Sequence, residues 1–536
     1  MMTNAPSGRD EEVRARNHGG ALPSMSAFHE MHAIKPNSDR ISTTRPIPFN
    51  ARHAIEAFLF SGLMYGLFLA WALLLSRAGV ADHVNLAVAH LGGAMSLITC
   101  WKLGRWGHAR FDSFGAALLL MGVAFRLHGF VDALAYGTRI DELYRYRTLP
   151  LPDPVIDLLL KGELITVLGM LLVACSWRLV IGNRIEKFSF LGNGHKVPIK
   201  LSLFVYAAAL LVDVARRVLG IGFGPLEQLL TLLYGFGVAA IYLVAARKGS
   251  TMRQVTVACL LAIPMSILAL SGGMKEDMLF PFIPAAILYW MGFNNIVARS
   301  AAVVLGIALL ALSQMYVHYV RETTWRSTGN LDVSTGELVA GFGGRVGNAQ
   351  SNDALGSISS RINQTSAHAT TVTLADHRGH EPMAVFGMIP ASVVPRVLWP
   401  GKPVMQPGAM HTARILGGNI PVSQIRSATA AGFFTELYLG GWWLGVILGA
   451  ITYGALLAGV QKWASRHDPG FGHQALCFLV LYWTIRFDEN HVVYAYTSLV
   501  FTMIFIWMLK HASRALGLRT LVAPQDRVLA RGASHE

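Results

Sequence analysis

Residues 433–459 read FFTELYLGGWWLGVILGAITYGALLAG, and this stretch decides the class of fold. Glu436 is its only charged residue, and about 20 predominantly apolar residues are enough for a helix to cross a hydrocarbon core of about 30 Å. The stretch therefore predicts a membrane-spanning helix. Gly441, Gly445 and Gly449 recur every four residues, which predicts a helix face of small residues used for close packing.

The rest of the chain has the same apolar character. Of the 536 residues, 53% are hydrophobic and 14% are charged, and the mean hydropathy is +0.44, whereas soluble domains carry roughly 25% charged residues. These values exclude an ordinary soluble protein and predict an all-α polytopic membrane protein. About 12 transmembrane helices are expected, at residues 54–76, 84–101, 113–135, 155–177, 201–219, 224–246, 254–271, 279–297, 300–318, 433–459, 473–486 and 492–510.

The distribution of Lys and Arg predicts how these helices are oriented. Basic residues are enriched in alternate short loops, which places those loops and both termini in the cytoplasm. The chain then divides into a disordered cytoplasmic tail at 1–52, nine spans within 53–318, one large external loop at 319–432, three spans within 433–512, and a cytoplasmic tail at 513–536. The net charge of +14 does not indicate a nucleic-acid partner, because the cations form no stripe with interleaved aromatic residues.

Several sequence motifs are absent. The chain has no Gly-Lys-Ser/Thr phosphate loop, no dinucleotide-binding glycine fingerprint, no HExxH zinc pair and no run of Cys and His, so we expect no cofactor and no metal. The four cysteines all fall within predicted spans, which argues against a disulfide framework. They are Cys100, Cys175, Cys259 and Cys477.

The large external loop contains short apolar segments. Leu355, Ile358, Ile362, Ala369 and Val372 recur near the helical period, which predicts a packed helix in the middle of the loop. The later stretch MAVFGMIPASVVPRVLW, residues 383–399, is apolar but is broken by two prolines. Such a segment suits a helix that lies in the membrane interface or re-enters it.

From Pro382 to Thr435 the chain has no acidic residue but several cations. A guanidinium binds phosphate oxygens through two hydrogen bonds and a Lys acts as a point charge, so this composition fits an amphiphile with a phosphate head. A solvated basic loop that touches lipid headgroups is the alternative. The cations are Arg396, Lys402, His411, Arg414 and Arg426, with Arg321 and Arg326 at the start of the loop and Lys275 in a preceding external turn.

Charged residues inside predicted spans are costly unless they are paired or face a cavity, so each is a site candidate. They are Arg126, His128, Asp132, Glu163, Asp213, Glu227, Glu436 and Arg486. We expect Arg126 and Asp132 to pair with each other or with neighbouring helices. Glu436 lies at the external end of its helix, where its carboxylate is a candidate general base.

Three stretches resemble Wzy-type oligosaccharide repeat-unit polymerases of the bacterial inner membrane. They are SGGMKEDMLFPFIPAAILYW (271–290), VPRVLWPGKP (394–403) and ATAAGFFTELYLGGWWLGVILG (428–449), and the second is the most specific. The resemblance covers residues 254–460, and the amino-terminal half is similar only in hydropathy. Lys275 departs from the family, which more often has Arg there.

The resemblance implies a C-type membrane glycosyltransferase fold and a glycosyltransferase activity. Such a protein joins undecaprenyl-pyrophosphate-linked repeat units into a polysaccharide at the periplasmic face, by block transfer with release of undecaprenyl pyrophosphate and without a metal. The implied partners are the lipid-linked oligosaccharide, membrane lipids, and a chain-length regulator and flippase of the same pathway.

The candidate residues fall into three groups. The departing pyrophosphate needs cations, the acceptor hydroxyl needs a base, and the sugars need aromatic rings to stack on. The predicted pyrophosphate-binding residues are Arg321, Arg326, Arg396, Lys402, Arg426, Arg361 and Lys275. The predicted catalytic residues are Glu436, His411 and Arg396, with Glu276 as a weaker base. The predicted sugar-binding residues are Trp325, Trp399 and Tyr438.

Two other functions stay open on the sequence. An O-antigen ligase has a similar number of spans and a large external loop, and uses the same lipid donor, so the residues do not identify the acceptor. A secondary transporter or lipid flippase is the alternative from another class, although the two halves of this chain lack the related broken helices that transporters commonly show.

Overall fold

The computed structural model describes residues 51–104, 114–137, 155–182, 198–217, 219, 227–247, 249–270, 275–293, 295–320, 364–394, 399, 401–402, 406–418, 421–422, 425, 431–467, 471, 475–480 and 491–515. Within these ranges the regular secondary structure is helical and no strand is present. The described chain begins at the first predicted span, and the predicted amino-terminal tail lies almost entirely outside it.

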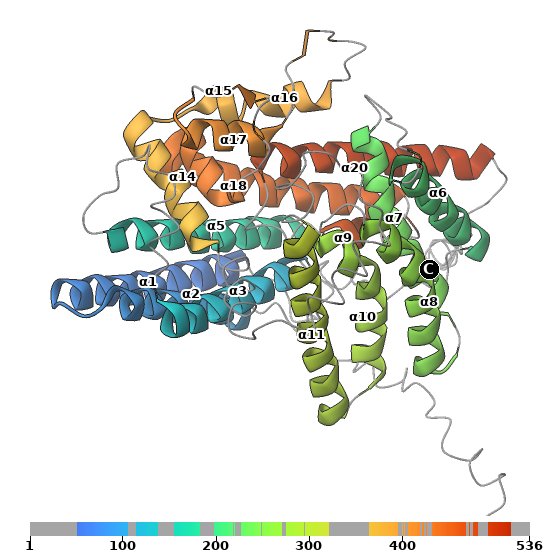
Figure 1. The fold of residues 1–536 in the computed structure, drawn as a ribbon, viewed down its shortest axis with the longest axis horizontal. Coiled ribbons are helices and arrows are strands. Elements are labelled where there is room, and N and C mark those ends of the chain that lie inside the picture. Colours follow the sequence, from blue (N-terminus) through green and yellow to red (C-terminus); the bar gives the residue numbers. More distant parts are fainter. Residues whose placement is uncertain are drawn as a thin grey trace, which may run out of the picture. The chain divides into compact units, whose positions relative to one another are not determined.

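The helices follow the apolar stretches of the sequence (Figure 1). The order is α1 (Ala51–Arg77), α2 (Asp82–Leu103), α3 (Phe114–Tyr136), α5 (Val155–Ile181), α6 (Ile199–Arg217), α7 (Glu227–Ala245), α8 (Thr251–Leu270), α9 (Lys275–Leu279), η6 (Phe280–Phe282), α10 (Ile283–Gly292), α11 (Ile296–Val320), α14 (Thr365–Arg378), α15 (Pro382–Val385), α16 (Met388–Val393), α17 (Pro407–Ile415), α18 (Phe433–His467) and α20 (Val492–Ala515).

Seven helices in the described part of the chain are long and apolar enough to cross a membrane, namely α1, α2, α3, α5, α8, α18 and α20. The prediction of a helical membrane protein is confirmed. Two other predicted spans correspond to the shorter helices α6 and α7, and α11 covers a third. The predicted span at 279–297 is divided into η6 and α10, because Pro281 and Pro284 interrupt a regular helix there.

Helix α5 lies at the centre of the first group of helices. Figure 1 shows α1, α2, α3 and α5 side by side, and α5 packs on each of the other three and on α18. Most α5 side chains are buried. Gly169 makes the α5–α18 approach possible, because a Cβ there would lie 2.1 Å from the ring of Phe434. Burial of a helix on all sides is expected when its neighbours surround it within a bundle.

The described helices of the large loop pack onto the spans. Helix α14 contacts α5, α17 and α18, while α15 contacts α18 and α16 contacts α20. Ala369 and Val372 are both buried in α14, which confirms the predicted packed helix at these two positions. The earlier part of that pattern, Leu355 to Ile362, lies outside the described residues.

Helix α18 has a sharp kink at Gly441 and Trp442. Trp442 has a φ of 49° and a ψ of −144°, a conformation that an L-residue rarely adopts. The kink brings the first part of the helix against the second, so that a Cβ on Gly445 would lie 2.3 Å from the main-chain oxygen of Leu437. Gly445 and Gly449 therefore form a close-packing surface, as predicted, and both pack against Leu437 in the preceding half of the same helix. Gly441 lies in the non-helical kink, so the prediction that it shares a helix face with the other two was wrong.

No disulfide joins the four cysteines, all of which lie in the described part of the chain, and Cys100, Cys175 and Cys477 are buried. The structure agrees with the prediction that they form no disulfide framework.

Candidate functional site

The carboxylate of Glu436 lies where α18 meets the start of α20. Its Oε1 is 3.1 Å from Nδ1 of His491, and its Oε2 accepts a hydrogen bond from the main-chain N–H of Val492. Both Glu436 and His491 are buried. The carboxylate thus accepts a main-chain donor in the first turn of α20, where a negative charge is favoured by the helix dipole.

His411, on α17, lies beside this pair. Its ring centroid is 6.3 Å from that of His491, and its Nε2 is 3.2 Å from Oγ1 of Thr371. Burial and the nearby His491 lower the pKa of His411 to about 3, with Arg414 acting in the same direction and Glu436 opposing it. His411 is therefore neutral at physiological pH. The structure brings two predicted catalytic residues, Glu436 and His411, into one buried cluster.

Tyr438 and the loop helix α14 meet close to this cluster. The Tyr438 hydroxyl donates to Oδ1 of Asp376 at 2.8 Å, and Lys161 Nζ donates to Oδ2 of the same carboxylate at 2.6 Å. These three residues come from α18, α14 and α5. Unlike Glu436, the Asp376 carboxylate is about one third exposed, with a side-chain exposure of 35%.

A second buried cluster lies within the spans. Arg126 Nη1 and His90 Nδ1 are 2.9 Å and 3.4 Å from Glu163 Oε2, and all three side chains are buried. Thr365 of α14 donates to the other oxygen of Glu163 at 3.5 Å. Arg126 therefore pairs with Glu163 of a neighbouring helix, which is one of the two arrangements that the sequence predicted. Asp213, another predicted site candidate, pairs with Arg216 on its own helix at 3.2 Å.

The described part of the cation-rich loop includes Lys402. Its Nζ donates to the main-chain oxygens of Val394 and Ser392 at 3.0 Å and 3.3 Å. It therefore lies at the carboxyl end of α16, where carbonyl groups favour a cation. Trp399 is exposed.

The other predicted site residues are less fully described. Arg321, Trp325, Arg326, Arg361, Arg396, Arg426 and Arg486 lie outside the described residues. Lys275 and Glu276 belong to α9, and Glu227 begins α7, but the structure describes only the backbone of these three.

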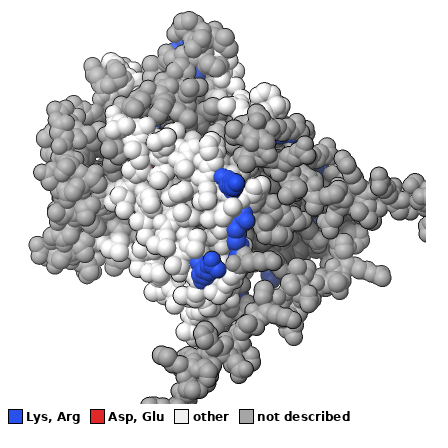
Figure 2. All heavy atoms as spheres, turned by 90° about the vertical axis from the view of Figure 1, so that its right-hand side faces the viewer, with Lys and Arg blue, Asp and Glu red and all other residues white. Residues whose placement is uncertain are grey.

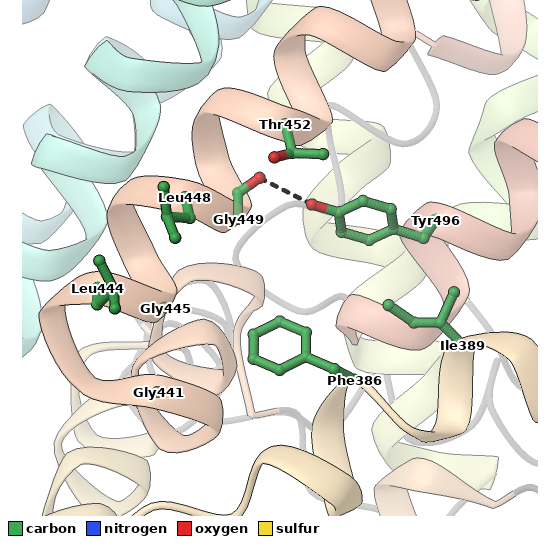
Figure 3. A pocket seen from close by; sticks show the side chains of 9 residues that line it. All are labelled: Phe386, Ile389, Gly441, Leu444, Gly445, Leu448, Gly449, Thr452 and Tyr496. Atoms are coloured by element: carbon green, nitrogen blue, oxygen red, sulfur yellow. Dashed lines mark hydrogen bonds between the residues drawn. The ribbon is translucent and has the colours of Figure 1, made fainter.

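An open apolar groove of about 380 Å³ runs along the glycine face of α18 (Figure 3). Phe386 and Ile389 of the α15–α16 segment form one side, and Tyr496 of α20 closes one end by donating to the Gly449 carbonyl at 2.8 Å. The remaining lining residues are Gly441, Leu444, Gly445, Leu448, Gly449 and Thr452. Leu444 and Leu448 are exposed beside the groove, so it is continuous with the apolar outer surface of α18.

Sequence reasoning missed His491, Asp376, Lys161 and His90. Each is a single polar residue with no motif around it, and its partner is distant in the sequence, as in the pairs His491–Glu436 and Lys161–Asp376. His90 and Lys161 lie within predicted spans. The argument that made Glu163 a site candidate, namely that an ionisable residue inside a span is costly unless it is paired, therefore applied to them equally. Within the described ranges, no group of three or more His, Cys, Asp or Glu side chains is arranged to hold a metal ion.

Comparison with known proteins gives one family match and several local similarities. Residues 179–517 match a family described as "Domain of unknown function (DUF8712)". Local similarity links the chain to the lipoprotein signal peptidases of Burkholderia mallei (strain SAVP1), at 29% identity over 24% of this chain and 74% of the relative, and of Burkholderia multivorans, at 32% identity over 23% of this chain and 71% of the relative. No solved structure matches the chain. Because the family match covers well over half of the residues, this membrane protein belongs to the DUF8712 family.

Proposed function

We propose that the protein polymerises undecaprenyl-pyrophosphate-linked oligosaccharide repeat units into a long surface or exopolysaccharide, as a Wzy-type glycosyltransferase. The reaction is a block transfer at the periplasmic face of the bacterial inner membrane. The polypeptide has about 12 spans in this proposal, with both termini in the cytoplasm and the 319–432 loop outside.

The observation that carries the proposal is the position of the described part of the acid-free segment, residues 382–435, beside an apolar groove. Ile389 of α16 lines the groove, and Lys402 places its ammonium group at the carboxyl end of the same helix. A ligand with a long apolar tail and a phosphate head matches both features, because the groove removes the tail from water and the cation attracts the head. An undecaprenyl pyrophosphate donor has this chemistry.

The transfer step needs a cation group and a proton acceptor. The acceptor hydroxyl oxygen bonds to the anomeric carbon of the donor, the bond from that carbon to the pyrophosphate oxygen breaks, and the hydroxyl proton passes to a base. Lys402 and the predicted arginines, above all Arg396, stabilise the charge on the departing pyrophosphate. Glu436 is the base in this proposal, and His411 is the hydrogen-bond acceptor that orients the hydroxyl group, because a pKa of about 3 makes its imidazole a weak base. His411 Nδ1 is buried with no hydrogen-bond partner among the described residues, which supports this acceptor role.

The described surface carries exposed cations. Figure 2 shows one face on which Lys and Arg side chains are exposed, with no Asp or Glu visible among the described residues. This excess of basic side chains agrees with the net charge of +14.

The experiment that tests the proposal is deletion of the gene in its host, followed by separation of the lipid-linked glycans by size. A polymerase predicts accumulation of a single repeat unit with loss of long polymer. Long polymer retained on the carrier lipid would identify a ligase, and unchanged external glycan would favour a transporter.

Substitution of Arg396 tests the cation role in the same host. Arg396→Ala should abolish chain extension while the protein is still produced and inserted, whereas Arg396→Lys should restore part of the activity if charge matters more than the two-pronged geometry. Full activity of the Ala variant would remove Arg396 from the site.

A further inference from the structure

A charged and aromatic surface lies where α5, α14 and α18 meet. The carboxylate of Asp376 accepts hydrogen bonds from Lys161 and Tyr438 and yet keeps a side-chain exposure of 35%. Two donors from two different helices therefore hold the carboxylate in one orientation while part of it faces solvent. Because the Asp376 carboxylate is held in a fixed orientation and is also accessible to solvent, it can accept a hydrogen bond from a ligand.

A second ion pair belongs to the same surface. Arg414 Nε is 3.1 Å from Oε2 of Glu381, and the two side chains are 17% and 29% exposed. The main-chain N–H of Glu381 donates to the carbonyl of Leu439, which is the residue after Tyr438. Arg378, two residues after Asp376, donates to the Arg414 carbonyl at 2.7 Å. The two ion pairs are thus connected through α14 and the start of α18.

Aromatic rings lie between and beside these charges. Lys161 Nζ is 4.9 Å from the centre of the Tyr438 ring, and Tyr438 meets Trp443 edge-on at 5.6 Å. Trp442 is exposed at 48% and contacts His380 at 5.0 Å between ring centres. Burial therefore does not explain why a large aromatic residue occupies the strained backbone position at 442, and strain of this kind is concentrated at functional sites.

The chemistry of this surface matches a saccharide. Carboxylates accept hydrogen bonds from sugar hydroxyls, ammonium and guanidinium groups donate to sugar oxygens, and aromatic rings cover the apolar faces of pyranose rings. A phosphate head is a poorer match, because Asp376 and Glu381 would repel it. We propose that the saccharide surface, formed by Lys161, Asp376, Glu381, Arg414, Tyr438 and Trp442, binds the sugars of the acceptor repeat unit, with Asp376 accepting a hydrogen bond from a hydroxyl group. The identity of this saccharide rests on the proposed polymerase function.

Binding by the purified full-length protein tests the proposal. The probe is the oligosaccharide that mild acid releases from the host's lipid-linked fraction, and the readout is the heat of binding during isothermal titration. Asp376→Asn keeps the side-chain size but removes the charge, so we expect at least a tenfold weaker affinity. The matched control is Glu56→Gln, which removes one partner of the exposed ion pair between Arg52 and Glu56 and should leave affinity unchanged.

A second variant separates binding from folding. Trp442→Gly relieves the unfavourable φ and removes the exposed ring, so its thermal stability should equal or exceed that of the wild type while its affinity falls several-fold. Wild-type affinity in both Asp376→Asn and Trp442→Gly would overturn the proposal, as would the absence of binding by the wild-type protein. Loss of the Asp376-dependent signal on addition of phosphatidylglycerol vesicles would assign the surface to lipid headgroups instead.

The cell experiment distinguishes this proposal from the proposed function. If gene deletion leaves a single repeat unit but Asp376→Asn restores full chain length, the polymerase stands and the saccharide surface is overturned. If deletion leaves polymer intact while Asp376→Asn still weakens binding of the oligosaccharide, the saccharide surface stands and the polymerase proposal fails.

Discussion

Glu163 on α5 and Arg126 on α3 form an ion pair of 2.9 Å, and each side chain is at most 4% exposed. His90 of α2 and Thr365 of α14 approach the same carboxylate. Side chains from two other spans, α2 and α3, and from one loop helix, α14, therefore surround the Glu163 carboxylate of α5. An ion pair at this depth is stable only because each partner compensates the other, since either charge alone would be costly in an apolar interior.

Removal of one partner of this pair should be strongly destabilising. Glu163→Gln leaves the Arg126 charge buried without its carboxylate, which typically costs about 3–5 kcal/mol. Thermal unfolding in detergent measures the effect. The double variant Glu163→Gln with Arg126→Met removes both charges and should recover much of the loss, and a double variant less stable than Glu163→Gln alone would contradict this account.

The close approach at the kink of α18 predicts a strong effect of a single methyl group. Gly445→Ala would place a Cβ 2.3 Å from the Leu437 carbonyl oxygen, a main-chain atom that cannot move aside without shifting the kink. We expect a loss of stability of about 1–3 kcal/mol. Gly459→Ala, later in the same helix with open space around it, is the matched control and should be neutral or slightly stabilising. Equal melting temperatures for the two variants would show that the kink is adaptable.

The hydroxyl of Thr371 connects two loop segments that are distant in the sequence. It lies 3.2 Å from His411 Nε2 and 3.1 Å from the Ala431 carbonyl oxygen. Thr371→Val removes both contacts at nearly constant volume and should cost about 1–3 kcal/mol, because His411 would be left buried without its partner. Thr373→Val is the control, since the hydroxyl of Thr373 donates to the carbonyl of Ala369 within its own helix. The two melting temperatures should therefore differ.

The buried state of His411 predicts a dependence of stability on pH. Its pKa is about 3 in the folded protein, against 6.5 for an unperturbed His. Below about pH 6.5 the unfolded chain binds a proton that the folded chain does not, so the free energy of unfolding falls by up to about 1.4 kcal/mol per pH unit until pH approaches the folded pKa. The wild type should therefore melt at a lower temperature at pH 5 than at pH 7.

The variant His411→Gln isolates this contribution, because it lacks the titrating group. The decrease in melting temperature between pH 7 and pH 5 should be smaller in the variant than in the wild type. An identical decrease in both proteins would mean that other groups cause the acid sensitivity.

Apolar length predicted most helices well. The expected spans 54–76 and 155–177 correspond to α1 (Ala51–Arg77) and α5 (Val155–Ile181). This works because a helix that satisfies its own backbone hydrogen bonds can cross a bilayer, and its apolar side chains are visible in the sequence. The prediction was less accurate at 279–297, where Pro281 and Pro284 divide the segment.

The candidate site was only partly visible in the sequence. Glu436 and His411 were selected because they are polar groups near apolar helices, and the structure places them in one cluster. His491, the partner of Glu436, carries no signal, because a lone His at the start of a helix has no spacing relationship to a carboxylate 55 residues away. Asp376 was missed for the same reason.

The sequence by itself determined that this is a helical membrane protein, that α18 contains a repeat of small residues, and that an acid-free segment, residues 382–435, leads into that helix. These properties depend on local composition and on the spacing of residues along the chain, and both can be read from consecutive residues of the sequence. Only the tertiary structure decided that Glu163 pairs with Arg126, that Asp376 meets Lys161 and Tyr438, and that the glycines of α18 accommodate the first half of the same helix. Such pairings depend on which helices pack together and on how each helix is rotated about its axis. A side chain contacts only those residues of the neighbouring helix that face it at the same height along the axis.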